Sequence, residues 1–211
     1  MKNAIIKTII HKYGKSNVDI VEARVKFMRS GKNFQLYLFV SGCILINYLG
    51  RTFSDLLQLP VWLDAVGTVF SAYALGPVCG AIVGAATNII YSFHSAAVLF
   101  YALTNISVGI IVGVFEKKGY LKSLFGVLSA AFVVTLLSVA ISTPMNFFLS
   151  GGAVGNIWGD GVVGLMQEMG FNKTISRIAG QFYVDFLDKT LIMLLLYIDV
   201  KLWNMKKEEH K

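Results

Sequence analysis

The fold is decided by residues 65–115, which read AVGTVFSAYALGPVCGAIVGAATNIIYSFHSAAVLFYALTNISVGIIVGVF and contain no Asp, Glu, Lys or Arg. As one helix this stretch would be about 75 Å long, more than twice the ~30 Å hydrocarbon thickness of a bilayer. We therefore expect it to fold back on itself inside the membrane. Gly76-Pro77 is the first expected turn, because Gly ends a helix at little cost and Pro cannot continue one. The polar cluster at residues 91–95 is the second.

Composition points to the same class of protein. Of 211 residues, 55% are hydrophobic and 15% are charged, and the mean hydropathy is +0.65, which is typical of integral membrane proteins. We expect an all-α integral membrane protein, a compact bundle of six transmembrane helices. The expected spans are residues 34–49, 60–75, 77–93, 97–115, 124–149 and 178–201. The membrane domain then covers residues 34–203, and residues 204–211 form a cytoplasmic tail.

The first 33 residues form a basic leader whose isoleucines follow a helical spacing. Two interpretations remain open for it. It is either an amphipathic helix on the inner membrane surface or a solvated tail whose charges only fix the orientation. It has no uncharged apolar core and no small-residue cleavage site, so a cleavable signal peptide is not expected.

The distribution of basic residues predicts the orientation. Of 19 Lys and Arg residues, only Arg51, Lys173 and Arg177 fall on the side opposite the termini, and Lys189 lies within a span. Because cytoplasmic loops carry the excess of positive charge, both termini are expected to be cytoplasmic. The net charge of +7 is then a consequence of topology, and no nucleic-acid partner is expected.

Polar side chains within the expected spans gather in the outer halves. Asp64, Tyr101 and Thr104 are examples, and the inner halves hold few such groups. A channel would need polar groups through the whole thickness, so this pattern predicts a pocket open to the outside and closed below. The candidate ligand-binding residues are Asn88, Asn105, Asn146, Trp158, Asp160, Gln181, Tyr183, Asp185, Asp188 and Lys189.

The last span holds the densest group of these residues. Gln181, Asp185 and Asp188 share one helical face. Lys189 follows Asp185 by four residues, which is the favourable order for an acid–base pair along a helix. This pair is either a structural ion pair or part of the ligand site, and Asp188 makes either a ligand contact or an interhelical contact.

The glycine-rich segment 150–177 is expected to be a long outer loop. Loops of this length are usually lids, binding loops or disordered segments. Trp158 beside Asp160 would suit recognition of a ring-containing ligand, although Trp158 could equally belong to the interfacial aromatic belt. The sequence shows no metal-ligand cluster and no catalytic motif, so neither a metal, a cofactor nor an enzyme activity is expected.

Glycines recur every four residues at Gly76, Gly80 and Gly84. Small residues at this spacing let helices approach closely. The packing partner is either another helix of this chain or another subunit.

Residues 63–88, which read LDAVGTVFSAYALGPVCGAIVGAATN, resemble the second and third helices of the substrate-binding S components of energy-coupling-factor (ECF) transporters. That family shows a Gly-Thr start, a Gly-Pro turn and Gly steps that end near an Asn. The resemblance covers residues 34–203. It implies a prokaryotic cell-membrane protein that binds a vitamin or related micronutrient from outside. Its partners would be a transmembrane coupling subunit and two cytoplasmic ATPase subunits.

The family often carries an Ala-x-x-x-Ala surface on its first helix for the coupling subunit. Here that region begins with Ser41-Gly42 and has no exact match. The candidate docking residues are Ser41, Gly42, Gly76, Gly80 and Gly84. Metal-uptake members have a His near Met1, and this chain has Lys2, which argues against nickel or cobalt.

Two other functions stay open from the sequence. One is a membrane-embedded ligand sensor, which would need a signalling partner. The other is an integral-membrane enzyme acting on a lipid, for which only Asp185 and Asp188 could supply catalytic groups.

Overall fold

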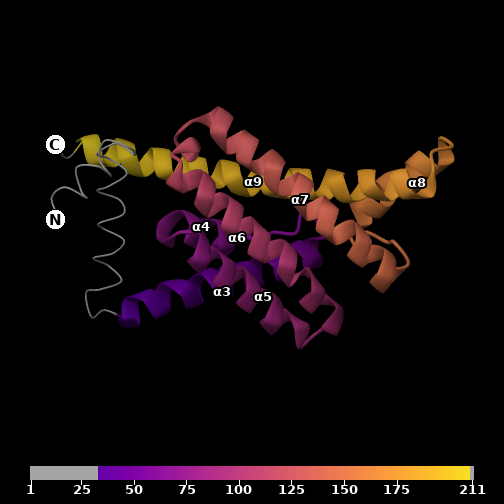
Figure 1. The fold of residues 1–211 in the computed structure, drawn as a ribbon, viewed down its shortest axis with the longest axis horizontal. Helices are drawn as coiled ribbons and strands as arrows, with labels where there is room; N and C mark the ends of the chain where they lie inside the picture. Colours follow the sequence, from indigo (N-terminus) through magenta and orange to yellow (C-terminus); the bar gives the residue numbers. More distant parts are fainter. Residues whose placement is uncertain (1–32, 210–211) are drawn as a thin grey trace, which may run out of the picture.

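The computed structural model describes residues 33–209, and every regular element in that range is a helix (Figure 1). The predicted all-α fold is confirmed for this range, and the basic leader lies outside the described residues except for Asn33. The α-helices are α3 (Asn33–Leu57), α4 (Val66–Leu75), α5 (Pro77–Ser92), α6 (Ala102–Lys117), α7 (Leu124–Ser150), α8 (Ile157–Glu168) and α9 (Lys173–Glu209). Two 3₁₀ helices, η1 (Ala96–Tyr101) and η2 (Tyr120–Lys122), precede α6 and α7.

Three helical segments in the described part are long and apolar enough to cross a membrane. They are Phe34–Leu57, Ala96–Lys117 and Leu124–Ser150. The apolar helices α4 and α5 have only 10 and 16 residues, fewer than the ~20 that a perpendicular span requires. These lengths are compatible with a membrane protein, and the count of six spans remains a prediction.

The chain reverses at both positions that the sequence indicated. Gly76 separates α4 from α5 with a φ of 96°, a conformation that only glycine adopts easily. Pro77 follows at the first turn of α5, where its missing N–H costs nothing. The second reversal follows Ser92, where α5 ends and the chain turns into η1.

Glycines set the close crossing of α5 with α4 and α6. A Cβ atom on Gly80 would lie 2.6 Å from the Cβ of Ala72 and 2.9 Å from the Cα of Gly109. A Cβ on Gly84 would lie 2.6 Å from the carbonyl oxygen of Asn105. Gly80 and Gly84 are therefore buried inside this chain and are not available to another subunit in this arrangement. This corrects their assignment as docking residues. The same applies to Gly76, whose backbone is buried in the turn.

A compact apolar core joins α4, α6, α7 and α9 at the end of the bundle remote from α8. Its members are small or β-branched on α4, α6 and α7, and larger on α9. Fully buried members include Ala65, Val69, Ala72, Val108, Val112, Ala130, Val134, Ile192, Met193 and Leu196. The apolar run that follows the acidic residues of α9 therefore anchors that helix in the bundle.

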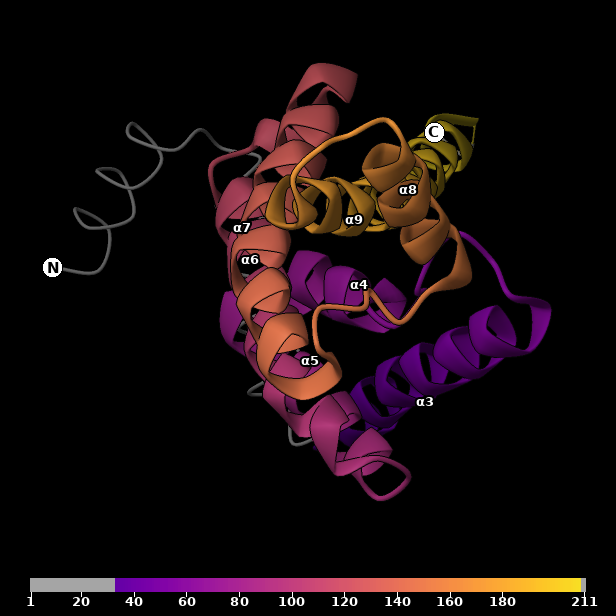
Figure 2. The same ribbon diagram turned by 90° about the vertical axis from the view of Figure 1, so that its right-hand side faces the viewer.

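The expected outer loop at residues 150–177 contains the helix α8, which corrects that prediction. Asn156 caps the helix by accepting a hydrogen bond from the N–H of Trp158 at 3.0 Å. Gly159 of α8 meets Gly180 of α9 so closely that a Cβ on Gly180 would lie 2.5 Å from the Gly159 carbonyl oxygen. The connection from α7 to α8 runs across the end of the molecule at which α8 lies (Figure 2). The local glycine content suggested a loop, but helix–helix contact outweighs it.

Other boundaries shift as well. Helix α3 continues to Leu57, eight residues beyond the predicted end at residue 49. The second span was expected from residue 60, but α4 begins only at Val66. Residues 58–65 between them are non-helical, and Gln58 and Leu63 have positive φ angles. Helix α9 runs to Glu209, so the expected tail at 204–211 is helical over its described part.

Substituting Gly80 tests the internal crossing. Gly80→Leu should lower the thermal unfolding temperature in detergent, because the added side chain meets Ala72 and Gly109 and such overpacking costs about 1–3 kcal/mol. Gly42→Leu is the matched control, since a Cβ there has nothing within 4 Å. Equal melting temperatures for the two variants would contradict internal packing at Gly80.

Candidate functional site

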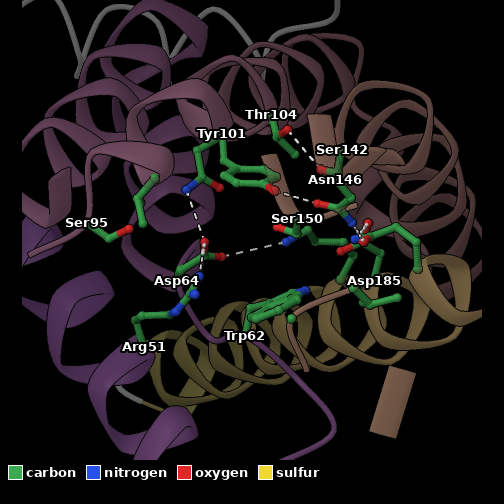
Figure 3. A pocket seen from close by; sticks show the side chains of 16 residues that line it. Arg51, Trp62, Asp64, Ser95, Tyr101, Thr104, Ser142, Asn146, Ser150 and Asp185 are labelled. Atoms are coloured by element: carbon green, nitrogen blue, oxygen red, sulfur yellow. Dashed lines mark hydrogen bonds and ion pairs between the residues drawn. The ribbon is translucent and has the colours of Figure 1, made fainter. Parts of the chain in front are cut away.

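A cavity of about 300 Å³ lies where α3 and α7 end and α9 begins. The start of α3 and the end of α9 lie at the opposite end of the molecule (Figure 1). Most of the lining side chains are polar, and four of them are charged (Figure 3). The lining residues are Arg51, Trp62, Asp64, Ser95, Val98, Tyr101, Thr104, Asn105, Ser142, Asn146, Ser150, Val154, Gly155, Gln181, Asp185 and Lys189.

The non-helical segment before α4 brings Trp62 and Asp64 to the cavity wall. Leu63 between them has a φ of 55°, which non-glycine residues rarely adopt. Asp188 of α9 holds this segment in place. Its Oδ1 atom accepts hydrogen bonds from the backbone N–H groups of Trp62 at 3.1 Å and Leu63 at 2.8 Å.

The second oxygen of Asp188 is also used inside the protein. Its Oδ2 accepts a hydrogen bond from Lys189 Nζ at 2.6 Å. Asp188 is fully buried and does not line the cavity. Its contact is therefore neither with the cavity nor between two helices, but between α9 and the non-helical segment before α4. The expected pairing of Lys189 with Asp185 is replaced by contacts of Lys189 with Asp188 and, at 3.9 Å, with Asp64.

A chain of hydrogen bonds crosses three helical elements along the cavity wall. The Tyr101 hydroxyl donates to Asn146 Oδ1. Asn146 Nδ2 donates to Gln181 Oε1 at 2.7 Å, and Gln181 Nε2 donates to Asp185 Oδ2 at 2.8 Å. Each group in this chain donates to the next one toward Asp185, and Figure 3 shows the link between Tyr101 and Asn146. The carboxylate therefore orients both amide groups, because an ionised carboxylate can only accept.

Asp64 lies on the opposite wall among three weaker contacts. Asn105 Nδ2 is 3.4 Å from its Oδ2 atom, and Arg51 Nη1 is 3.7 Å from the same atom. Lys189 Nζ is 3.9 Å from its Oδ1 atom, which is buried and has no hydrogen-bond partner. The Arg51 guanidinium also stacks on the Trp62 ring, 4.7 Å from the ring centroid.

Five of the ten predicted site residues line the cavity. They come from α6, α7 and α9, and all are buried. These residues are Asn105, Asn146, Gln181, Asp185 and Lys189. The structure thus brings together polar side chains that are up to 84 positions apart in the sequence.

The remaining predicted residues do not line the cavity, and Asp188 and two others hydrogen-bond to residues that do. Asn88 accepts a hydrogen bond from Asn105 Nδ2 at 2.6 Å. Asp160 accepts from the backbone N–H groups of two lining residues, Val154 and Gly155. The other two residues, Trp158 and Tyr183, do not line the cavity.

Trp158 has 51% of its surface exposed and does not cover the cavity. Its Nε1 atom donates to the carbonyl oxygen of Gln58 at 2.7 Å, which ties α8 to the non-helical segment. Asn156 donates to the carbonyl oxygen of Leu59 at 2.9 Å and reinforces this link. Stacking of a ligand on Trp158 is therefore not supported, whereas Trp62 does line the cavity.

Several lining residues were not among the predicted site residues. Asp64, Tyr101 and Thr104 belong to the same outer group of polar residues, and that depth pattern could have identified them. Arg51 was expected in a loop, because the first span was predicted to end before it. The other polar or aromatic residues missed are Trp62, Ser95, Ser142 and Ser150.

The site is suited to binding a small polar molecule. Its lining offers two carboxylates, two cations, amides and hydroxyl groups around one cavity. Within residues 33–209, no three His, Cys, Asp or Glu side chains are grouped so that they could hold a metal ion. The volume lies at the lower end of the ~300–1,000 Å³ range of small-molecule sites.

Comparison with known proteins yields no relative. No family model, no curated protein and no solved structure matches the chain. The resemblance to ECF S components therefore rests on the residues quoted from the sequence, and the function is argued from the cavity.

The structural role of Asp188 can be tested by removing its charge and measuring the stability of the protein. Asp188→Asn should lower the melting temperature strongly, because it leaves Lys189 buried with only the 3.9 Å contact to Asp64. Breaking a buried pair in this way costs about 3–5 kcal/mol. Asp199→Asn, at an exposed site on the same helix, is the control. Thermal unfolding in detergent measures both, and an unchanged melting temperature for Asp188→Asn would refute its structural role.

Proposed function

We propose that this chain is the substrate-binding subunit of an ECF-type transporter and captures a vitamin or related micronutrient from outside the cell. The observation that carries the proposal is a polar cavity enclosed by helices with an apolar exterior. Large apolar side chains such as Phe125 and Phe148 are more than four-fifths exposed, at 81% and 87%. Such a surface suits a lipid environment, in which the polar groups must be satisfied inside the bundle.

The charge distribution supports an outward-facing cavity. Lys117, Lys118 and Lys122 lie at or beside the connection between α6 and α7, and Lys201 lies late on α9. This end is remote from the cavity (Figure 1). The positive-inside rule assigns it to the cytoplasm, together with both termini. The cavity then lies on the outer side of a prokaryotic cell membrane.

The proposed topology has six spans, formed by α3, α4, α5, η1 with α6, α7 and α9. Helices α4 and α5 are short for spans, with 10 and 16 residues. Local thinning of the bilayer and burial of their ends against neighbouring helices would accommodate them. The non-helical residues 58–65 also fit this topology, because irregular backbone is tolerated at membrane depth where it lines a cavity.

ATP-driven import requires partners, which we propose are a transmembrane coupling subunit and two cytoplasmic ATPase subunits. Helix α3 is the candidate docking surface. Only 11% of the residues in its most apolar stretch are buried within the chain. The corresponding shares for the other two long apolar segments are 33% and 39%. Ser41 is exposed on α3, and Gly42 has open space beside its backbone.

Ligand binding can be tested at Asp185. The ligand that co-purifies with the protein is first identified by native mass spectrometry, and its affinity is then measured by calorimetry. Asp185→Asn should weaken binding at least tenfold, because losing a charged hydrogen bond typically costs about 1.5–3 kcal/mol. The fold should persist, since an Asn oxygen can still accept from Gln181. The control Asp199→Asn should bind normally. Equal ligand affinity in the two variants would show that Asp185 does not contact the ligand.

Partner docking can be tested at Gly42. Gly42→Leu should prevent co-purification with the coupling subunit, because close helix approach depends on the absent side chain. The cavity does not include Gly42, so ligand affinity and melting temperature should stay at the wild-type values. Normal assembly of this variant would place the docking surface elsewhere.

A further inference from the structure

The two cations of the cavity wall are each hydrogen-bonded to an acid that does not line the cavity. Arg51 Nε donates to Asp55 Oδ2 at 3.1 Å. Lys189 Nζ donates to Asp188 Oδ2 at 2.6 Å. Neither Asp55 nor Asp188 lines the cavity. Each positive charge in the wall is therefore paired with a carboxylate that lies outside the cavity.

The two acids of the cavity wall, Asp64 and Asp185, have no comparable partner of their own. Asp185 is only 3% exposed, and its Oδ2 accepts from the neutral Gln181. The Oδ1 atom of Asp64 is buried and receives no hydrogen bond. The nearest cations, Arg51 and Lys189, are 3.7 and 3.9 Å from the Asp64 oxygens, beyond hydrogen-bond length.

We propose that the ligand carries a positively charged, hydrogen-bond-donating group, such as an amine or amidine, that binds to Asp64 and Asp185. This inference rests on the proposed function of the cavity as a ligand site. A buried carboxylate oxygen without a donor is costly, and a charged donor compensates for that cost most effectively. An anionic ligand would add negative charge beside two carboxylates whose neighbouring cations are already paired.

Three aromatic probes of similar size and different charge test the proposal on the full-length protein in detergent. Benzylamine is cationic, benzyl alcohol is neutral and benzoate is anionic, and each is small enough for a cavity of about 300 Å³. At one pH and ionic strength, benzylamine should raise the melting temperature in a saturable manner. Benzyl alcohol and benzoate should raise it less or not at all. A shift with benzoate that equals or exceeds the benzylamine shift would overturn the proposal, and so would the absence of a benzylamine shift.

Two conservative variants locate the effect. Asp64→Asn and Asp185→Asn should each weaken benzylamine binding at least tenfold, whereas Asp199→Asn should leave it unchanged. An unchanged benzylamine affinity in both of the first two variants would contradict the proposal. If one of them fails to fold, the other variant and the charge series on the wild-type protein still decide the question.

The co-purified ligand separates this inference from the transport proposal. A released micronutrient without a cationic group would refute the inference and leave the transporter function standing. A chain that binds benzylamine through Asp64 and Asp185 but never assembles with a coupling subunit would refute the transporter function alone.

Discussion

Asp188 accepts two backbone hydrogen bonds from the segment before α4 and one from the neighbouring Lys189, and this buried carboxylate fixes the position of one cavity wall. Backbone N–H groups outside a helix lack the regular partners that a helix provides, and leaving them unpaired away from water costs free energy. Asp188 supplies the acceptor from a helix 125 positions later in the chain. Without it, the N–H groups of Trp62 and Leu63 would lose this acceptor in the segment that brings Trp62 and Asp64 to the cavity.

Along helix α9, the polar residues that contact the cavity and the neighbouring backbone precede the apolar residues that enter the core. Gln181 and Asp185 come first and face the cavity, and Asp188 lies one turn further on, where it binds backbone. Ile192 and Met193 then enter the apolar core. Two carboxylates three residues apart thus have different roles, because one faces a cavity and the other faces the backbone of a neighbouring segment. Their difference follows from what packs against each turn of the helix.

The sequence predicted features that depend on local chemistry or on depth in an apolar segment. The turn at Gly76-Pro77 is local. Asn146, Gln181 and Asp185 were predicted as site residues because polar groups in apolar helices cost free energy unless they are paired. Helix α8 was missed because its glycines favour a loop, whereas contact between Gly159 and Gly180 stabilises the helix. The pairing of Lys189 with Asp188 and Asp64 was missed because Asp64 lies on a distant segment, and helical spacing alone favoured Asp185.

The two ends of the bundle are built differently, and this difference bears on how a ligand could enter. The end with the apolar core is held by close helix crossings, such as that of Gly80 with Gly109, where even one added methyl group meets backbone. At the cavity end, seven of the sixteen lining residues lie in connections, namely residues 58–65, the turn and η1 before α6, and residues 151–156 before α8. Connections can change shape without disturbing a packed crossing, because few helical hydrogen bonds are broken. Rearrangement of the connections at the cavity end would therefore leave the glycine crossings of α5 with α4 and α6 intact.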